Sequence, residues 1–179
     1  MAKEHAAALK AMALCRALSG AELDAIAAIV ETQEVAAGKE LFREGDPGDG
    51  LFLVVAGEID VIKRGPRGER SLARLGVGAV LGEISLLTNE VRSATGRATV
   101  DTRVLRLPVQ RFRPLLDGGS TAALKIAAAI AEVLARRLAA MNTMVLELAD
   151  KVDPAGSTLP ALKDTELAEL YRTMQVWSF

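Results

Sequence analysis

A carboxylate and a guanidinium lie nine positions apart near the middle of the chain, at Glu83 and Arg92. Arg92 can donate two parallel, charge-assisted hydrogen bonds to a phosphate. Glu83 can accept hydrogen bonds from ribose hydroxyls, as the acidic residue of dinucleotide sites does. Gly82 lets the backbone approach a ligand closely, and free N–H groups at the start of a short helix after Glu83 would meet further phosphate oxygens. These residues predict a site for a compact anion that carries both a ribose and a phosphate.

The residues around this pair follow a known pattern. The stretch reads Gly82-Glu83-Ile84-Ser85-Leu86-Leu87, then a short loop, then Arg92-Ser93-Ala94. It resembles the phosphate-binding cassette of the cyclic nucleotide-binding domain family, which reads Gly-Glu-aliphatic-small-Leu-aliphatic, a loop, and Arg-small-Ala. Two positions depart from that pattern: Val91 stands where Pro often precedes the Arg, and Glu90 places a second acid near Arg92. An ion pair between Glu83 and Arg92 on a surface loop is the alternative interpretation.

The resemblance implies a role for each residue of the cassette. Glu83 would bind the ribose of a cyclic nucleotide, and Arg92 with Ser93 would bind its phosphate. Val91 would be among the residues that give the pocket apolar support. cAMP is favoured over cGMP as the ligand. The full set of expected ligand-binding residues is Gly82, Glu83, Ile84, Ser85, Arg92, Ser93, Ala94 and Asn142.

A second, independent pattern lies upstream of the cassette. Residues 38–50 are rich in Gly, Asp and Pro, and an apolar run broken by Gly57 follows over residues 51–62. Short apolar runs separated by such residues predict strands joined by tight turns. The same rhythm is typical of the β-roll in the cyclic nucleotide-binding family.

The expected fold class is α+β, an antiparallel β-roll (a double-stranded β-helix or jelly roll) with N-terminal helices, a short cassette helix and a long C-terminal helix. Residues 4–17 are amphipathic, and Ser19 with Glu22 predicts a capping box for a second helix that ends near Glu31. Strands are expected between residues 33 and 108. The expected division is an N-terminal helix over residues 1–18, the roll over 19–119, the long helix over 120–150, and a linker with a docking tail over 151–179.

Composition argues against several classes of function. The chain has 179 residues, half of them hydrophobic, and a formal net charge of −1, which predicts a single soluble domain that does not bind nucleic acid. No apolar run reaches the roughly 18 residues of a membrane span. The one cysteine, Cys15, predicts a buried side chain and a reducing, cytoplasmic location. With His5 as the one histidine, neither a metal site nor catalysis is expected, and no cofactor.

The predicted helix over residues 120–150 carries two apolar stripes. The first, with the spacing of a coiled-coil seam, comprises Ala127, Ile130, Leu134, Met141, Met144 and Leu148. The second comprises Leu124, Ala128, Ala131, Ala135, Leu138, Val145 and Ala149. One stripe can pack on the roll and leave the other for a second copy, so a parallel homodimer is expected. The alternative is one helix that folds back over its own domain.

In transcriptional relatives this helix also reaches the nucleotide base. The matching positions here are Met141 and Asn142, and of these Asn142 can form hydrogen bonds with a base edge. Only 29 residues follow Asp150, so the winged helix-turn-helix of those relatives is not expected. Residues 164–179 form an aromatic-rich tail that either packs back on the chain or docks on another protein.

These observations together predict a cytoplasmic, non-enzymatic cyclic nucleotide sensor that signals through rearrangement of a dimer or of its tail. The alternatives are a ligand-free structural or adaptor protein built on the same roll, and a cGMP sensor.

Overall fold

The computed structural model describes residues 2–66, 68–88 and 90–152. The chain divides into two compact units, Met1–Glu132 and Val133–Phe179. The first unit contains both sheets and the start of the last helix, and the described part of the second unit is the rest of that helix. The predicted linker and tail after Val152 lie outside the described residues.

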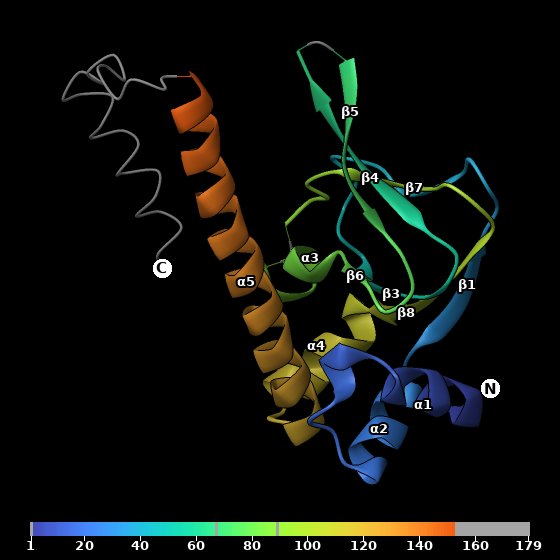
Figure 1. Ribbon diagram of the computed structural model, residues 1–179. Coiled ribbons are helices and arrows are strands. Elements are labelled where there is room, and N and C mark those ends of the chain that lie inside the picture. The colour runs from blue at the N-terminus through green and yellow to red at the C-terminus, as the bar shows by residue number, and fades with distance from the viewer. Residues whose placement is uncertain (1, 67, 89, 153–179) are drawn as a thin grey trace. The chain divides into compact units, whose positions relative to one another are not determined.

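Two four-stranded antiparallel sheets form the first unit (Figure 1). Sheet A has the order β1-β8-β3-β6, with β1 at Glu31–Val35, β8 at Thr102–Pro108, β3 at Gly50–Ala56 and β6 at Val80–Leu81. Sheet B has the order β2-β7-β4-β5, with β2 at Glu40–Phe42, β7 at Thr95–Ala98, β4 at Ile59–Gly65 and β5 at Gly68–Leu75. The chain passes repeatedly from one sheet to the other, and this confirms the predicted β-roll.

The core of the roll comes from the faces of the two sheets that meet. Side chains alternate across a strand, so each sheet supplies one apolar face. The buried core residues are Val35, Leu41, Phe52, Val54, Ile59, Leu81, Ala98 and Val104. Phe42 and Phe52 stack with their ring centroids 5.6 Å apart, one from each sheet.

The N-terminal segment forms two short helical pieces in place of the single helix predicted over residues 4–17. Helix α1 spans Ala2–Lys10, and a 3₁₀ turn follows at Ala13–Cys15. Between them Met12 is extended, with φ −82° and ψ 134°. In one continuous helix Met12 and Cys15 would share a face and Leu14 would point largely away from Met12, and the break lets all three become buried. The predicted burial of Cys15 is confirmed, and burial raises the pKa of its thiol to about 11.

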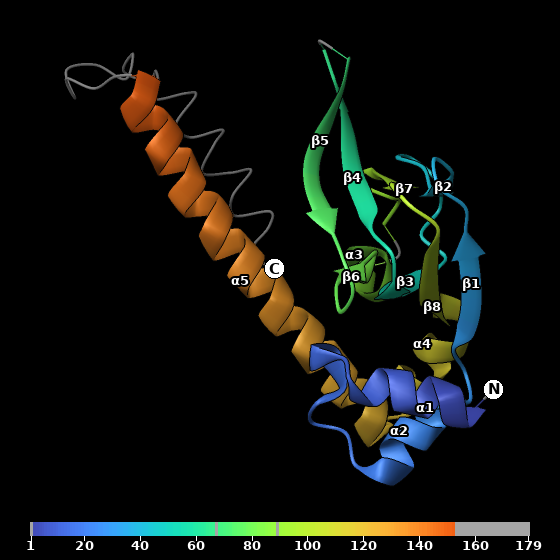
Figure 2. The same cartoon turned by 45° about the vertical axis from the view of Figure 1, so that its right-hand side comes forward.

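Helix α2 spans Gly20–Ala27 and packs beside α1 (Figure 2). The predicted capping box is confirmed, because the Ser19 hydroxyl accepts from the Glu22 N–H and the Glu22 carboxylate accepts from the Ser19 N–H. The helix ends earlier than predicted, since Glu31 pairs with Arg106 as the first residue of β1. Glu22 also forms an ion pair with Lys125, at 2.8 Å.

The bonds that Glu22 makes should give the protein a pH-dependent stability. The hydrogen bond from Lys125 and the backbone hydrogen bond at Ser19 lower the pKa of Glu22 from 4.5 to about 2. A lowered folded-state pKa stabilises the protein above the unfolded-state value, so this contribution is complete above pH 4.5 and is lost as the pH falls to about 2. The urea concentration at the midpoint of unfolding should therefore be higher for the unchanged chain than for Glu22→Gln at pH 7, and the two midpoints should converge toward pH 2.

The exposed Asp24 of the same helix provides a matched control. Asp24→Asn should leave the midpoint near that of the unchanged chain across this pH range. A difference between the unchanged chain and Glu22→Gln that stays constant from pH 7 to pH 2 would contradict the role given to the carboxylate.

Two further helices complete the described chain. Helix α4 spans Val109–Asp117, and α5 spans Thr121–Val152. The buried residues of α5 in the first unit are Ala122, Ala123, Ile126 and Ile130. Of these buried residues, Ile130 belongs to the first predicted stripe, and Ala122, Ala123 and Ile126 belong to neither stripe. Leu124 of the second stripe is exposed. Within the described chain no single helix meets the length and apolarity of a membrane span, and α4 with part of α5 meets them only as a bent pair.

Candidate functional site

The predicted cassette connects β6 of sheet A to β7 of sheet B. Gly82 follows β6 with φ at 75°, which is a left-handed conformation that favours glycine. Helix α3, Glu83–Thr88, begins directly after it. A Cβ atom on Gly82 would overlap Nη1 of Arg92 and lie 2.9 Å from the carbonyl oxygen of Gly50. Gly82 is therefore needed both for the turn and for the space that the Arg92 side chain occupies.

Arg92 points into the roll and is 2% exposed. Its Nη2 forms an ion pair with Oδ1 of Asp49 at 2.6 Å. Its guanidinium carbon lies 4.5 Å from the ring centroid of Phe42 and 5.1 Å from that of Phe52. Its Nε and Nη1 are buried and have no hydrogen-bond partner among the described residues. The site thus contains a buried cation whose Nε and Nη1 donor atoms have no acceptor among the described residues.

The electrostatics of this arrangement favour an anionic ligand. Burial lowers the pKa of Arg92, and the hydrogen bond to Asp49 opposes that effect. An arginine nevertheless stays protonated in proteins, so the guanidinium carries its charge in the closed site. A buried charged group with unmade hydrogen bonds is costly. An anion that accepts from Nε and Nη1 would remove that cost.

The backbone of Arg92 is fixed by the loop between β2 and β3. The Gly45 N–H donates to the carbonyl of Arg92 at 2.9 Å, and the Arg92 N–H donates to the carbonyl of Asp46 at 2.8 Å. On the other side, Nζ of Lys63 donates to the carbonyl of Ser93 at 2.7 Å. These hydrogen bonds fix the backbone at Arg92 and Ser93, and thereby orient the Arg92 side chain, in the ligand-free chain.

The structure brings most of the other predicted site residues together in the cassette. Glu83 is the first residue of α3 and is 4% exposed. Ser85 is buried against Gly48, where a Cβ atom would overlap it. Ala94 is buried, Ile84 is half-buried, and Ser93 is exposed. The roles of these residues toward a ligand stay predictions.

Val91 is 54% exposed, so its predicted role as apolar support of the pocket is wrong in this structure. The stacked rings of Phe42 and Phe52 provide that support instead. Asn142 belongs to the second unit, and its predicted contact with a base stays a prediction.

Sequence reasoning missed Asp49, the ion-pair partner of Arg92. It lies between Gly48 and Gly50 at the start of β3. A Cβ atom on Gly48 would overlap Ser85, and a Cβ atom on Gly50 would lie 2.8 Å from the carbonyl oxygen of Leu107 on β8. These close approaches exist only in the folded chain, and the sequence shows Asp49 only as an acid between two glycines.

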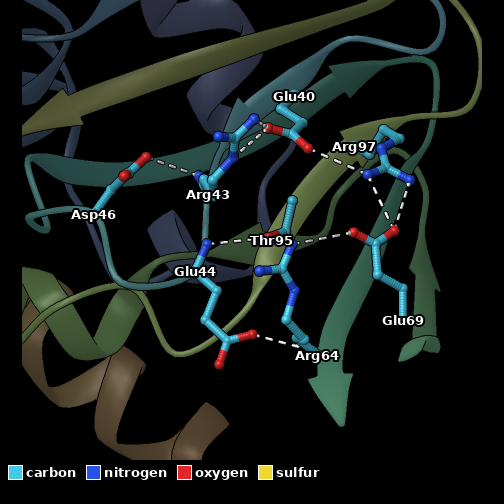
Figure 3. Close-up of polar contacts among 8 residues, drawn as sticks. All are labelled: Glu40, Arg43, Glu44, Asp46, Arg64, Glu69, Thr95 and Arg97. Carbon is cyan, nitrogen blue, oxygen red and sulfur yellow. Dashed lines mark hydrogen bonds and ion pairs between the residues drawn. The ribbon is translucent and has the colours of Figure 1, made fainter. Parts of the chain in front are cut away.

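A hollow of about 480 Å³ lies on sheet B and is a different feature from the cassette (Figure 3). Its lining comprises Glu40, Arg43, Glu44, Ile62, Arg64, Glu69 and Thr95, none of them a predicted site residue. Thr95 lies on the face of β7 opposite to Gly96, whose position contacts the core ring of Phe42.

The charged groups of this hollow pair with one another. Glu40 binds Arg43 at 2.8 Å and Arg97 at 3.2 Å, and Glu69 binds Arg97 at 3.3 Å. Glu44 pairs with Lys63 at 2.7 Å. Exposed ion pairs of this kind each contribute only about 0–1 kcal/mol to stability. Among the described residues, no group of three or more His, Cys, Asp or Glu side chains could hold a metal ion.

The site thus combines a β-roll, a glycine-led cassette and a buried arginine with two unpaired donor atoms. Residues 32–118 match the family model described as the cyclic nucleotide-binding domain. The chain belongs to the cyclic nucleotide-binding domain family, whose domains are regulatory and are not enzymes themselves.

Individual relatives agree with this assignment. The chain is 34% identical over 131 residues to the cyclic AMP receptor protein of Thermus thermophilus, which covers 73% of this chain and 59% of that protein. A cyclic nucleotide-binding domain from Methylobacillus flagellatus aligns with a TM-score of 0.71 at 26% identity, covering 82% of this chain and 83% of that one. A cyclic nucleotide-binding-like protein from Brucella abortus aligns with a TM-score of 0.55 at 31% identity, covering 64% and 98%. The chain spans 23–59% of the length of the first curated relatives that it matches.

Proposed function

We propose that this chain is a cyclic nucleotide sensor that binds cAMP in preference to cGMP at the cassette. Arg92 binds the phosphate in this proposal, and Glu83 binds the ribose. The main observation that supports this proposal is the buried guanidinium of Arg92, whose Nε and Nη1 have no hydrogen-bond partner among the described residues. A phosphate offers acceptor oxygens in the geometry that a guanidinium matches.

The surroundings of Arg92 support the same ligand. Glu83 stands at the N-terminus of α3, close in sequence to Gly82, and Gly82 makes room for the guanidinium itself. Ser93 is exposed beside the buried Arg92, where a hydroxyl can meet a further phosphate oxygen. The similarity to a protein named a cyclic AMP receptor supports cAMP as the nucleotide.

Isothermal titration calorimetry of the full chain with cAMP, cGMP and 5′-AMP tests this proposal. Saturable heat is expected with cAMP, weaker binding with cGMP, and weakest binding with 5′-AMP, whose open phosphate does not have the cyclic shape. No heat and no thermal shift with any of the three at millimolar concentration would contradict the proposal. That result would favour the ligand-free adaptor, in which Asp49 and the two rings already complete the site.

The signal would pass through a parallel homodimer formed by α5. Leu124, Leu138 and Met141 are 51%, 60% and 61% exposed. Leu124 and Leu138 belong to the second predicted stripe and lie two heptads apart, and Met141 belongs to the first stripe, which has the spacing of a coiled-coil seam. A second copy of α5 is the partner that matches such a repeat, and ligand binding at the cassette would alter the packing of this helix pair or the position of the C-terminal segment.

Sedimentation equilibrium of the full chain tests the dimer. The unchanged chain is expected to be a dimer, and Leu138→Gln combined with Met141→Gln should shift it toward monomer by at least tenfold in dissociation constant. This follows because each exposed apolar side chain contributes about 1.5–3 kcal/mol when it is fully buried. Leu72→Gln, which changes an equally exposed leucine on β5, should leave the dimer intact. A monomer at every concentration, or a dimer indifferent to the α5 changes, contradicts this part of the proposal.

A further inference from the structure

Ser93 lies between two peptide groups that are held by different elements of the roll. The peptide before it is fixed by Gly45, whose N–H donates to the carbonyl of Arg92 at 2.9 Å. The peptide after it is fixed by Lys63 on β4, whose Nζ donates to the carbonyl of Ser93 at 2.7 Å. Planar peptides leave only φ and ψ free at each residue, so the two hydrogen bonds together restrict both dihedrals of Ser93. They thereby restrict the direction in which its side chain leaves the backbone.

Lys63 is itself held in place by Glu44. Its Nζ forms an ion pair with Oε1 of Glu44 at 2.7 Å, and Oε2 of the same carboxylate accepts from the backbone N–H of Arg64 at 3.1 Å. The Glu44 N–H donates to the hydroxyl of Thr95 at 3.0 Å (Figure 3). The hydrogen bonds from Lys63 and from the Arg64 backbone hold the pKa of Glu44 below its ordinary value. The ammonium of Lys63 therefore lies between an ionised carboxylate and the carbonyl of Ser93.

The contact between Lys63 and Ser93 lies where the ladder between β4 and β7 ends. The last pair of that ladder joins Ile62 to Thr95, whereas β4 continues to pair with β5 as far as Gly65. The carbonyl of Ser93 thus lies beyond the ladder, and it is the side chain of Lys63 that joins it to β4. A substitution at Lys63 can remove this connection and leave the backbone pairing of sheet B intact.

We propose that Lys63 is a positioning residue of the phosphate site, which holds Ser93 so that its hydroxyl faces a bound phosphate. The inference rests on the proposed function and adds a residue to the same site. Lys63 acts through the backbone of Ser93 and does not touch the ligand. Ser93 is exposed, so the direction of its side chain depends on the hydrogen bonds of its flanking peptides more than on packing.

Loss of this hydrogen bond should transfer an ordering cost to the binding step. A ligand that needs the Ser93 hydroxyl would have to order the backbone there on binding, and a site that is already ordered avoids that cost. Lys63→Met should therefore weaken cAMP binding about tenfold, within the cost of fixing the backbone of one residue. Lys63→Arg keeps donors for both the Ser93 carbonyl and Glu44, and should recover most of the affinity.

A double-mutant cycle with Ser93→Ala tests this inference, with cAMP affinity measured by calorimetry on the full chain. In the unchanged chain Ser93→Ala should weaken binding about tenfold, because a hydrogen bond from the hydroxyl to a phosphate is charge-assisted. In the Lys63→Met background the same change should weaken binding less than about twofold, since the hydroxyl there is no longer directed at the ligand.

The matched control is Arg64→Met, at the next position of β4. It removes the same charge as Lys63→Met, but the Arg64 guanidinium pairs with Glu69 at 4.0 Å, and the backbone N–H that bonds Glu44 is kept. It should leave cAMP affinity unchanged. Thermal melts of each variant check that the chain is folded, and a Lys63→Met chain that does not fold is replaced by Lys63→Gln.

The outcomes separate positioning from simple attraction. Equal losses from Ser93→Ala in both backgrounds, or an equal loss from Arg64→Met and Lys63→Met, would mean that Lys63 acts by its charge alone and would overturn the inference. Unchanged affinity in Lys63→Met or in Ser93→Ala, with binding by the unchanged chain, would also overturn it but would leave the proposed function in place. Absence of cAMP and cGMP binding by the unchanged chain would overturn both.

Discussion

Arg92→Met is expected to abolish measurable cAMP binding and, at the same time, to raise the thermal midpoint of the ligand-free chain. Loss of a buried charge partner costs about 2–5 kcal/mol, so affinity should fall by a factor on the order of hundreds or more. Calorimetry measures this loss directly. A methionine also removes the guanidinium fork, which leaves no group that can replace its two free donors.

The expected gain in stability has the same physical origin as the loss of binding. Arg92 is buried with two unpaired donor atoms, and its ion-pair partner Asp49 is itself half-exposed. Replacing a buried ion pair by apolar side chains of similar volume is often neutral or stabilises a protein by about 1–4 kcal/mol, and removal of one partner is costly only where the other charge stays buried and unpaired. The methionine can also pack against the rings of Phe42 and Phe52. Asp49 keeps Arg106 as its partner and is not left unpaired.

Differential scanning calorimetry without ligand separates this explanation from simple damage to the fold. Arg70→Met, on the exposed surface of β5, is the control and should change neither affinity nor midpoint. A lower midpoint for Arg92→Met would mean that the arginine stabilises the ligand-free roll. Retained cAMP affinity in that variant would remove Arg92 from the proposed site altogether.

Local sequence patterns predicted the parts of this molecule that depend on local interactions. The capping box at Ser19 and Glu22 forms because both partners lie within one helical turn. The cassette forms because Gly82 can adopt a positive φ, which lets α3 start directly after β6. The alternation of short apolar runs and turn residues also predicted strands joined by tight turns, and the resemblance to the family implied that these strands form a roll.

Features that depend on distant contacts were not predicted. The break at Met12 arises because three nearby side chains all find room in the core, and nothing in the amphipathic pattern of residues 4–17 shows where that core is. Asp49 and Arg92 are 43 residues apart, so their pairing follows from the folded roll and not from any motif. The same holds for Val91, whose exposure depends on the path of the cassette loop.

The glycine before α3 offers the sharpest test of how closely the cassette fits Arg92. Gly82→Ala should reduce both stability and cAMP affinity, because the new Cβ atom meets Arg92 Nη1 and the carbonyl of Gly50. The left-handed backbone adds a strain of roughly 1–2 kcal/mol for a residue other than glycine. Overpacking adds typically about 1–3 kcal/mol, and displacement of the guanidinium should weaken cAMP binding by about a hundredfold.

Gly78→Ala separates these two causes, because Gly78 has φ at 89° and a Cβ atom there would meet nothing within 4 Å. It carries the backbone strain without the overpacking. Urea unfolding should therefore show a loss of roughly 1–2 kcal/mol for Gly78→Ala and a clearly larger loss for Gly82→Ala. Calorimetry should show near-normal cAMP affinity for the first variant alone. Equal losses of stability and equal affinities in the two variants would mean that Gly82 serves only the turn, and that Arg92 does not depend on the space which the glycine leaves.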